Sequence, residues 1–213
     1  MMKPIQKFAH HFQNLPLIAI LRGLAPQESP AIGAALVEAG FGLLEVPLNS
    51  PDPLQSIGQL ARAHPQALVG AGTVLTAQQV REVHAAGGQL IVSPHFDAQV
   101  VHEAVGLGMV CLPGIATPTE AFAALQAGAH GLKLFPAEAA SPASLKAMRA
   151  VLPTGTLVIP VGGITAATLG PWMAAGAQGF GLGSALYQPG KSAQAVRHAA
   201  TAFVAAYRGC LVV

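Results

Sequence analysis

The sequence predicts an α/β fold of the (β/α)8 barrel class, and three observations lead to this prediction. Short apolar segments recur along the 213 residues, separated each time by room for one helix and two loops. The intervening segments carry apolar residues at helical spacing. Four of these segments end in Ala-Gly just before an apolar segment, and glycine commonly follows the end of a helix. Apolar strands alternating with helices indicate a parallel sheet covered by helices.

Eight apolar segments are the predicted strands, and their first residues lie 21 to 26 positions apart. In chain order they are LIAILR (17–22), LLEVPL (43–48), LVGAGT (68–73), QLIVSP (89–94), VCLPGI (110–115), GLKLFP (131–136), LVIPVGG (157–163) and GFGLGS (179–184). Eight such units in one chain favour a closed barrel. The alternative is an open doubly wound sheet, which more often has roughly five or six strands.

The segments between the strands are predicted to be amphipathic helices. Apolar residues follow the i, i+3, i+4, i+7 pattern at Ile32, Ala35, Leu36 and Ala39, and again at Val196, Ala199, Ala200 and Phe203. Capping boxes are predicted at 76–79 (TAQQ) and 117–120 (TPTE), the second with Pro118 at the first helical position. No linker interrupts the pattern, so we expect one domain over 1–213, with a short lead-in segment before the first strand at about 17.

The composition indicates a chain that buries much of itself. It is 52% hydrophobic and 9% charged, against roughly 25% charged in an average soluble protein. The net charge of +2 and the lack of a basic run make nucleic acid and anionic membrane unfavoured partners. No run of 18 apolar residues predicts a membrane span, and residues 1–16 do not resemble a secretory signal. Cys111 and Cys210 are therefore expected to be reduced, in a cytoplasmic setting.

Lys133 is the main candidate for chemistry. It is the single one of five lysines inside a predicted strand, and Phe135 is expected to share its face. A buried ammonium is unfavourable unless it is paired or neutral. One interpretation is a structural ion pair with Glu45, the one acid inside a predicted strand. The other is a lysine whose pKa is lowered by burial, which would make it a nucleophile for Schiff-base formation.

Other polar residues are predicted at the carboxyl ends of the strands, where barrel enzymes place their active sites. Glu45 would serve as an acid or base beside an iminium. Ile18, Ile20 and Arg22 are expected to share the inward face, and so are Val69, Ala71 and Thr73. Glycine-rich ends at 161–165 (VGGIT) and 181–184 (GLGS) favour a phosphate site built from backbone N–H groups, although such glycines also serve tight turns. The eight histidines form no helical ligand pair, so no metal site is predicted.

With these residues identified, the sequence resembles the KDPG (2-keto-3-deoxy-6-phosphogluconate) and KHG aldolase family of class I aldolases, from about Pro16 to Arg208. The motifs that carry the resemblance are LIAILRG, LLEVPLNS, LVGAGTVLT, QLIVSP, GLKLFPAE, PVGGIT and GLGSALY. The resemblance implies a (β/α)8 barrel, a homotrimer, a phosphorylated keto acid substrate and no cofactor. It implies the following roles: Lys133 as the Schiff-base lysine, Glu45 as the acid/base, Arg22 and Thr73 as carboxylate ligands, and Gly162, Gly163, Gly183 and Ser184 as the phosphate site.

Two departures from the gluconate-type pattern suggest a branch of this family. Asn49 in LEVPLNS replaces an arginine, and Val161 in PVGG replaces a threonine. Both changes resemble the branch that acts on the galactonate epimer, with the gluconate epimer as the alternative substrate. Two further alternatives are a phosphosugar isomerase or epimerase on the same barrel, which needs no lysine in a strand, and a barrel that binds a phosphorylated metabolite without turnover.

Overall fold

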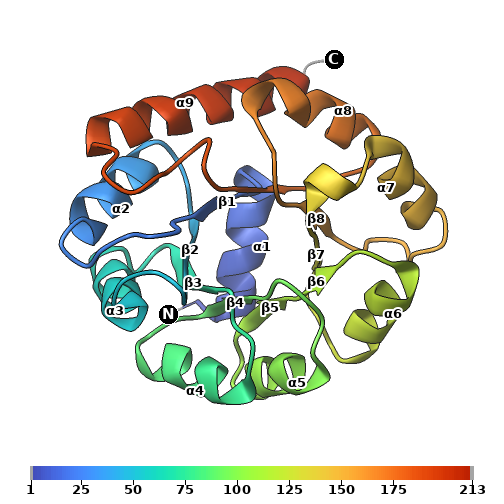
Figure 1. The fold of residues 1–213 in the computed structure, drawn as a ribbon, viewed down its shortest axis with the longest axis horizontal. Helices are drawn as coiled ribbons and strands as arrows, with labels where there is room; N and C mark the ends of the chain where they lie inside the picture. Colours follow the sequence, from blue (N-terminus) through green and yellow to red (C-terminus); the bar gives the residue numbers. More distant parts are fainter. Residues whose placement is uncertain (1, 212–213) are drawn as a thin grey trace.

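A computed structural model describes residues 2–211 of the chain. Its strands are β1 (Leu17–Ile20), β2 (Leu43–Pro47), β3 (Leu68–Gly72), β4 (Leu90–Val92), β5 (Val110–Leu112), β6 (Gly114–Ile115), β7 (Leu132–Leu134), β8 (Val158–Pro160) and β9 (Phe180–Leu182). Its α-helices are α1 (Pro4–Asn14), α2 (Ser29–Glu38), α3 (Pro53–Ala63), α4 (Ala77–Ala85), α5 (Ala98–Gly106), α6 (Pro118–Gln126), α7 (Pro142–Arg149), α8 (Leu169–Ala174) and α9 (Ala193–Cys210), with short 3-10 helices η1 (Ala137–Ala139) and η2 (Ala166–Thr168). Helices α2 to α9 surround the strands (Figure 1).

All strand pairs are parallel, as predicted, and they form two sheets. The order is β5-β4-β3-β2-β1-β9 in one sheet and β6-β7-β8 in the other. The predicted fifth strand, 110–115, is split at Pro113 into β5 and β6, because proline has no N–H to donate to the ladder. A single parallel bridge between Val161 and Gly181 links the segment after β8 to β9. The architecture is thus α/β with curled parallel strands.

The strands present two different apolar faces. Inward-facing residues such as Ile18, Ile20 and Ile159 form one cluster, and the opposite faces pack against the surrounding helices in a larger cluster. The inward prediction for Ile18 and Ile20 is confirmed. The prediction for strand β3 is wrong: Val69 and Ala71 lie in the outer cluster.

The register of β2 and β3 explains why Val69 and Ala71 face outward. Glu45 is paired with Gly70, and Pro47 with Gly72, so the two glycines share the inner face with Glu45. Parallel strands buried on both faces carry apolar residues at every position, which hides the direction of the alternation.

The helix boundaries follow the sequence signals closely. The four Ala-Gly glycines, Gly40, Gly87, Gly128 and Gly176, all have φ between +93° and +100°, the left-handed conformation of a helix C-terminus. The capping box of Thr117 and Glu120 is complete. Thr76 also caps its helix, but Gln79 accepts from the N–H of Leu75 rather than from that of Thr76.

Helix α1 lies in the segment before the first strand, which was predicted only as a short lead-in. Phe8 and Phe12, one turn apart, pack against each other and against the inner cluster. In Figure 1 this helix lies across the centre of the ring of strands. No helix of residues 2–211 is long and apolar enough to cross a membrane.

Candidate active site

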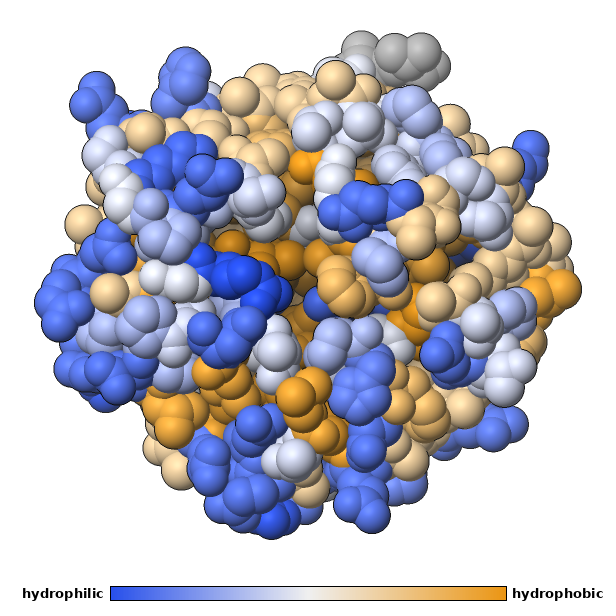
Figure 2. Space-filling view, in the orientation of Figure 1, coloured by the Kyte–Doolittle hydropathy of each residue, from blue (hydrophilic) through white to orange (hydrophobic). Residues whose placement is uncertain are grey.

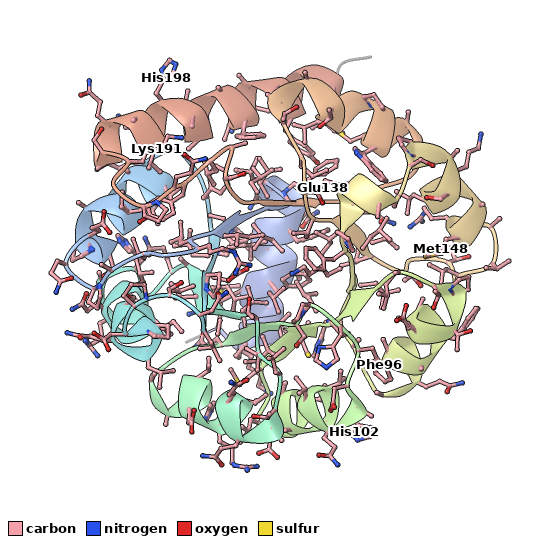
Figure 3. The ribbon with its side chains drawn as sticks, in the orientation of Figure 1. Phe96, His102, Glu138, Met148, Lys191 and His198 are labelled. Carbon is pink, nitrogen blue, oxygen red and sulfur yellow. The ribbon has the colours of Figure 1, made fainter. Side chains whose placement is uncertain are left out.

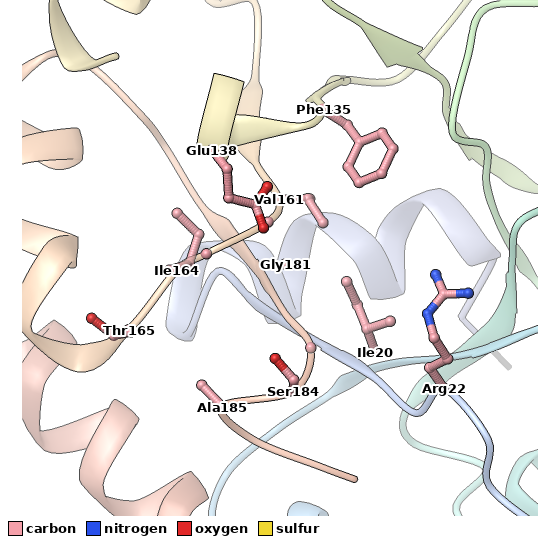
Figure 4. A pocket seen from close by; sticks show the side chains of 13 residues that line it. Ile20, Arg22, Phe135, Glu138, Val161, Ile164, Thr165, Gly181, Ser184 and Ala185 are labelled. Carbon is pink, nitrogen blue, oxygen red and sulfur yellow. The ribbon is translucent and has the colours of Figure 1, made fainter. Parts of the chain in front are cut away.

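A cavity of about 210 Å³ opens at the carboxyl ends of β1, β7, β8 and β9. Its floor is apolar, formed by Ile20, Val161 and Gly181, and Arg22 and Glu138 lie at opposite sides of it (Figure 4). Figure 2 shows apolar residues in the hollow at the centre of this face. The cavity therefore combines an apolar floor with a few polar groups, as small-molecule sites usually do.

Lys133 is buried inside β7, as the sequence predicted, and 6% of its surface is exposed. Its Nζ lies 4.5 Å from the centre of the Phe135 ring. Burial lowers the pKa of Lys133, the charge of Glu45 opposes this shift, and the charge of Arg22 adds to it. No salt bridge within residues 2–211 includes Lys133. The amine is therefore held near Phe135 without a partner carboxylate in contact, which weakens the interpretation as a structural ion pair.

Lys7 provides a useful comparison, because it also has 6% of its surface exposed, although its amine is less deeply buried than that of Lys133. Its Nζ donates to the carbonyl of Pro65 at 2.7 Å and to Oε1 of Gln89 at 3.1 Å. Burial lowers the pKa of Lys7 as well. A buried lysine with two acceptors is a structural group, and the contrast singles out Lys133 as the reactive candidate.

Glu45 lies on the inner face of β2, with 2% of its surface exposed. Burial raises the pKa of Glu45 to about 7, although the charges of Lys133 and Arg22 and the N–H of Gly72 oppose the shift. Its Oε2 has no hydrogen-bond partner among the described residues. A carboxyl group that titrates near neutral pH is suited to both accepting and donating a proton.

Arg22 follows β1 and lines the cavity, where its Nη1 donates to Oδ1 of Asn49 at 2.8 Å. The charge of Arg22 acts on the pKa of both Lys133 and Glu45, so the three charged groups form one electrostatic unit. Asn49, noted from the sequence only as a departure from a family pattern, thus orients the guanidinium. An arginine at this position would remove that acceptor and bring a second cation beside Arg22.

Thr73 directly follows Gly72 and has φ +55°. A β-branched residue in the left-handed region is strained, and such strain is concentrated at functional sites. Thr73 does not line the cavity, and its inward placement does not follow from strand alternation, because β3 ends at Gly72.

The two glycine-rich loops lie side by side at one end of the cavity. Gly162 and Gly163 have φ +112° and +63°, and together with Gly183 and Ser184 they line it. None of these four residues donates its backbone N–H to another group among residues 2–211. Unpaired N–H groups around a cavity are the requirement for binding an anion.

The structure thus brings together most of the predicted site. Phe135, Val161, Arg22 and the loop residues line one cavity. Lys133 and Glu45 are not among its lining residues: both are buried in their strands, Lys133 against Phe135 and Glu45 within the electrostatic influence of Lys133 and Arg22. Glu138 lines the same cavity and was not predicted, although it stands in the GLKLFPAE motif just after a strand end. Figure 3 places Glu138 inside the ring of helices, and His102 and His198 outside it.

Within residues 2–211, no group of three or more His, Cys, Asp and Glu side chains is arranged to hold a metal ion.

Comparison with known proteins identifies close relatives. The family model described as KDPG and KHG aldolase matches residues 9–199. The 2-dehydro-3-deoxy-6-phosphogalactonate aldolase of Escherichia coli K12 is 50% identical, covering 92% of this chain and 96% of its own. A probable enzyme of the same name from Rhizobium meliloti is 50% identical, covering 90% and 91%. KHG/KDPG aldolase of E. coli K12 is 32% identical, covering 75% of each chain.

Solved structures agree with these matches. One reported as native KDPGal superimposes with a TM-score of 0.92 at 49% identity, covering 93% of this chain and 97% of its own. A designed cube-shaped cage made by fusing symmetric oligomeric domains contains a domain with a TM-score of 0.91 at 49% identity, covering 93% of this chain and 74% of that one. Sequence and structure together therefore show that the chain belongs to the KDPG and KHG aldolase family.

Proposed function

We propose that this aldolase cleaves 2-dehydro-3-deoxy-6-phospho-D-galactonate into pyruvate and D-glyceraldehyde 3-phosphate by class I chemistry. The observation that carries the proposal is Lys133, a buried lysine held against Phe135 without a bonded acceptor in the part of the chain that the structure describes. The two relatives at 50% identity bear the name of this activity. The alternative substrate is the gluconate epimer, the substrate named for more distant relatives at 32% identity.

In the first step, the neutral amine of Lys133 attacks the C2 ketone, and loss of water gives an iminium. An unperturbed lysine with a pKa near 10.4 would be almost wholly protonated at neutral pH. Burial lowers the pKa of Lys133 and so raises the neutral fraction. Because the lysine itself becomes the electron sink, the reaction needs neither a metal nor an organic cofactor.

In the second step, Glu45 moves protons. As the C3–C4 bond breaks, its electrons enter the iminium to give an enamine, and Glu45 accepts the proton of the C4 hydroxyl directly or through a water. Glyceraldehyde 3-phosphate leaves, and Glu45 returns a proton to C3. Water then hydrolyses the new iminium, releasing pyruvate and the free amine. A pKa of about 7 allows one carboxyl group to serve in both directions.

The remaining residues place the two charged ends of the substrate. Arg22, held by Asn49, and Thr73 are the proposed ligands of the carboxylate. The free N–H groups of Gly162, Gly163, Gly183 and Ser184 are the proposed ligands of the phosphate. Val161 lines the cavity and is proposed to contact the substrate near C4.

The two sheets nearly join at both of their edges, which bears on whether the barrel is closed. Only Pro113 separates β5 from β6, and the Val161–Gly181 bridge joins the other edges of the two sheets. We therefore infer a closed (β/α)8 barrel. From the resemblance to the family we also propose that it assembles as a homotrimer in the cytoplasm. The low charged content of 9% supports burial of further surface between subunits.

Reductive trapping tests the nucleophile. Borohydride added with pyruvate should attach one reduced pyruvate to the wild type at Lys133. Lys133→Arg should show neither trapping nor cleavage, because guanidinium stays charged at any working pH. Lys7→Arg is the matched control, and it should trap pyruvate normally. Trapping in the Lys133 variant would refute the proposal, and turnover without trapping would favour a metal-dependent aldolase or an isomerase.

A comparison of both C4 epimers tests the substrate. The wild type should cleave the galactonate epimer with the higher kcat/KM. Val161→Thr adds a hydroxyl at nearly constant volume, and it should shift the ratio toward the gluconate epimer by roughly 0.5–1.5 kcal/mol, the net range for one hydrogen bond gained. Adding Asn49→Arg should extend the shift but also lower overall activity, because Arg22 loses its acceptor.

Val161→Ala is the control for the epimer test, since it changes the volume at position 161 without adding a hydroxyl group. Its epimer ratio should stay near that of the wild type. A Val161→Thr ratio equal to the wild-type ratio would place the selectivity in other residues. A wild type inactive on the galactonate epimer would refute the substrate assignment.

A further inference from the structure

Glu138 places a negative charge at the end of the cavity that is proposed to hold phosphate. Among the described residues, the charged side chains that line the cavity are Arg22 and Glu138. Arg22 lies on the opposite side, bound to Asn49 (Figure 4). A phosphate carried to the glycine loops would thus meet a carboxylate and no cationic side chain.

The carboxylate of Glu138 lies directly over the two glycines. A β-carbon added to Gly162 would collide with Oε2 of Glu138, and one added to Gly163 would lie 2.7 Å from its Cγ. In Figure 4 the Glu138 side chain extends toward the loop between Val161 and Ile164. The acidic group therefore lies against the two glycines on the side where a β-carbon would stand, beside backbone N–H groups that have no partner within residues 2–211.

The backbone that carries Glu138 is fixed, whereas its side chain is exposed. The N–H of Ala137 donates to the carbonyl of Val161 at 2.9 Å, and Ala140 closes the turn of η1 on Ala137 at 3.1 Å. These bonds attach η1 to the loop that follows β8. The carboxylate can consequently leave the glycines by side-chain rotation alone, a motion of picoseconds to nanoseconds for an exposed residue.

We propose that Glu138 is an internal anion that covers the phosphate cradle of the empty enzyme and rotates into solvent when a phosphorylated ligand enters. It would weaken affinity at this end of the site, because its negative charge repels an entering anion and its side chain fills space beside the glycines. Phosphate and phosphorylated product would bind more weakly than to the bare glycine loops, which favours release. This inference rests on the proposed role of the glycine loops in phosphate binding.

Direct titration with inorganic phosphate, followed by calorimetry or by phosphorus NMR, tests the proposal. Glu138→Gln keeps the shape of the side chain and removes its charge. It should lower the dissociation constant for phosphate by about two- to fivefold, the range in which partly exposed charges act. The difference should shrink at high salt, since exposed charges are screened. Glu138→Ala, which clears the space as well, should bind phosphate at least as tightly as Glu138→Gln.

Glu82→Gln is the matched control, because Glu82 is exposed on α4 outside the cavity and its loss changes the net charge equally. Its phosphate affinity should equal that of the wild type. An unchanged or weakened affinity in Glu138→Gln, or no phosphate binding in any variant, would overturn the proposal. Pyruvate trapping on Lys133 needs no phosphate, so it remains a separate test of the aldolase chemistry in the same variants.

Discussion

At the scale of one residue, the burial of Glu45 has two opposing effects. It gives the carboxyl group a pKa suited to proton transfer, and it lowers the stability of the folded protein. The side chain must be buried to hold a pKa of about 7, and this burial makes its ionised form unfavourable in the folded protein. The same physical cause therefore predicts both the pH dependence of activity and that of stability.

For activity, we expect exchange of the pyruvate methyl protons to fall toward low pH. Below an apparent pKa of about 7, the rate should drop about tenfold per pH unit, because the base form is lost. Glu45→Gln should slow exchange by about 10²–10⁴-fold at neutral pH. Borohydride trapping in this variant reports Lys133 alone and should persist. Wild-type exchange in Glu45→Gln would remove Glu45 from the mechanism.

The change of stability with pH is opposite to that caused by an ordinary salt-bridged acid, whose contribution is lost as the pH falls. The folded protein holds the Glu45 proton with a pKa of about 7, against 4.5 for an unperturbed glutamate. Stability is therefore lost as pH rises from about 4.5 to 7, and the loss is complete above 7. Glu45→Gln should be more stable than the wild type at pH 8 by about 1–3 kcal/mol, with little difference at pH 4.5. Thermal melts at the two pH values measure this, and equal differences would contradict it.

At this scale the sequence predicted the residues whose chemistry conflicts with their surroundings. Lys133 and Glu45 stand out because a charge inside an apolar strand is rare. Glu138 follows a strand, where polar residues are ordinary, so nothing marked it. The Arg22–Asn49 bond joins two loops that are 27 positions apart, and no local pattern encodes which loop side chains meet.

At the scale of elements, β3 leaves space on the inner face of the sheet, because two of its inward-facing residues are glycines. Gly70 and Gly72 lie on the face shared with Glu45. A β-carbon on Gly72 would meet the Glu45 carboxylate, whereas one on Gly70 would meet the backbone of Leu90 on β4. The two glycines thus leave room for different groups, one for catalysis and one for sheet pairing.

The pair Gly72→Ala and Gly70→Ala separates these roles. Gly72→Ala should fold but displace the buried carboxylate, and a displacement of about 1 Å lowers kcat by about 10²-fold. Gly70→Ala should instead destabilise the protein by about 1–3 kcal/mol or more, because a backbone cannot move aside as a side chain can. Activity assays and thermal melts on both variants compare the two effects. The same pattern of loss in both variants would show that the glycines have one common role.

The elements themselves were predicted well, because each one has local signals. The Ala-Gly helix ends and the Thr117 cap appear as expected. The face of β3 was wrong, and the split at Pro113 was missed. Both depend on register with neighbouring strands, which a strand apolar on both faces does not reveal.

At the scale of the whole molecule, the two ends of the ring of strands have different tasks. The carboxyl ends carry the cavity. The opposite end is covered by α1, whose Lys7 bonds Pro65 and Gln89 next to the starts of β3 and β4. Helix α1 was not predicted, because an eight-unit pattern has no place for a helix that precedes the first strand. The Phe8 and Phe12 spacing was the available signal.

The same chemical change at the two ends should therefore have opposite consequences. Phe8, 3% exposed, packs α1 into the inner cluster, so Phe8→Ala should destabilise the protein by about 3–5 kcal/mol while pyruvate trapping well below the melting temperature stays normal. Phe8→Leu, a smaller change, should show the same trend more weakly if the alanine variant does not fold. Phe135→Ala removes the ring beside Lys133 from a half-buried position, so it should change trapping and its pH dependence with a smaller loss of stability. Melting temperatures and trapping rates on the three variants test the division, and it fails if Phe8 variants that remain folded lose trapping.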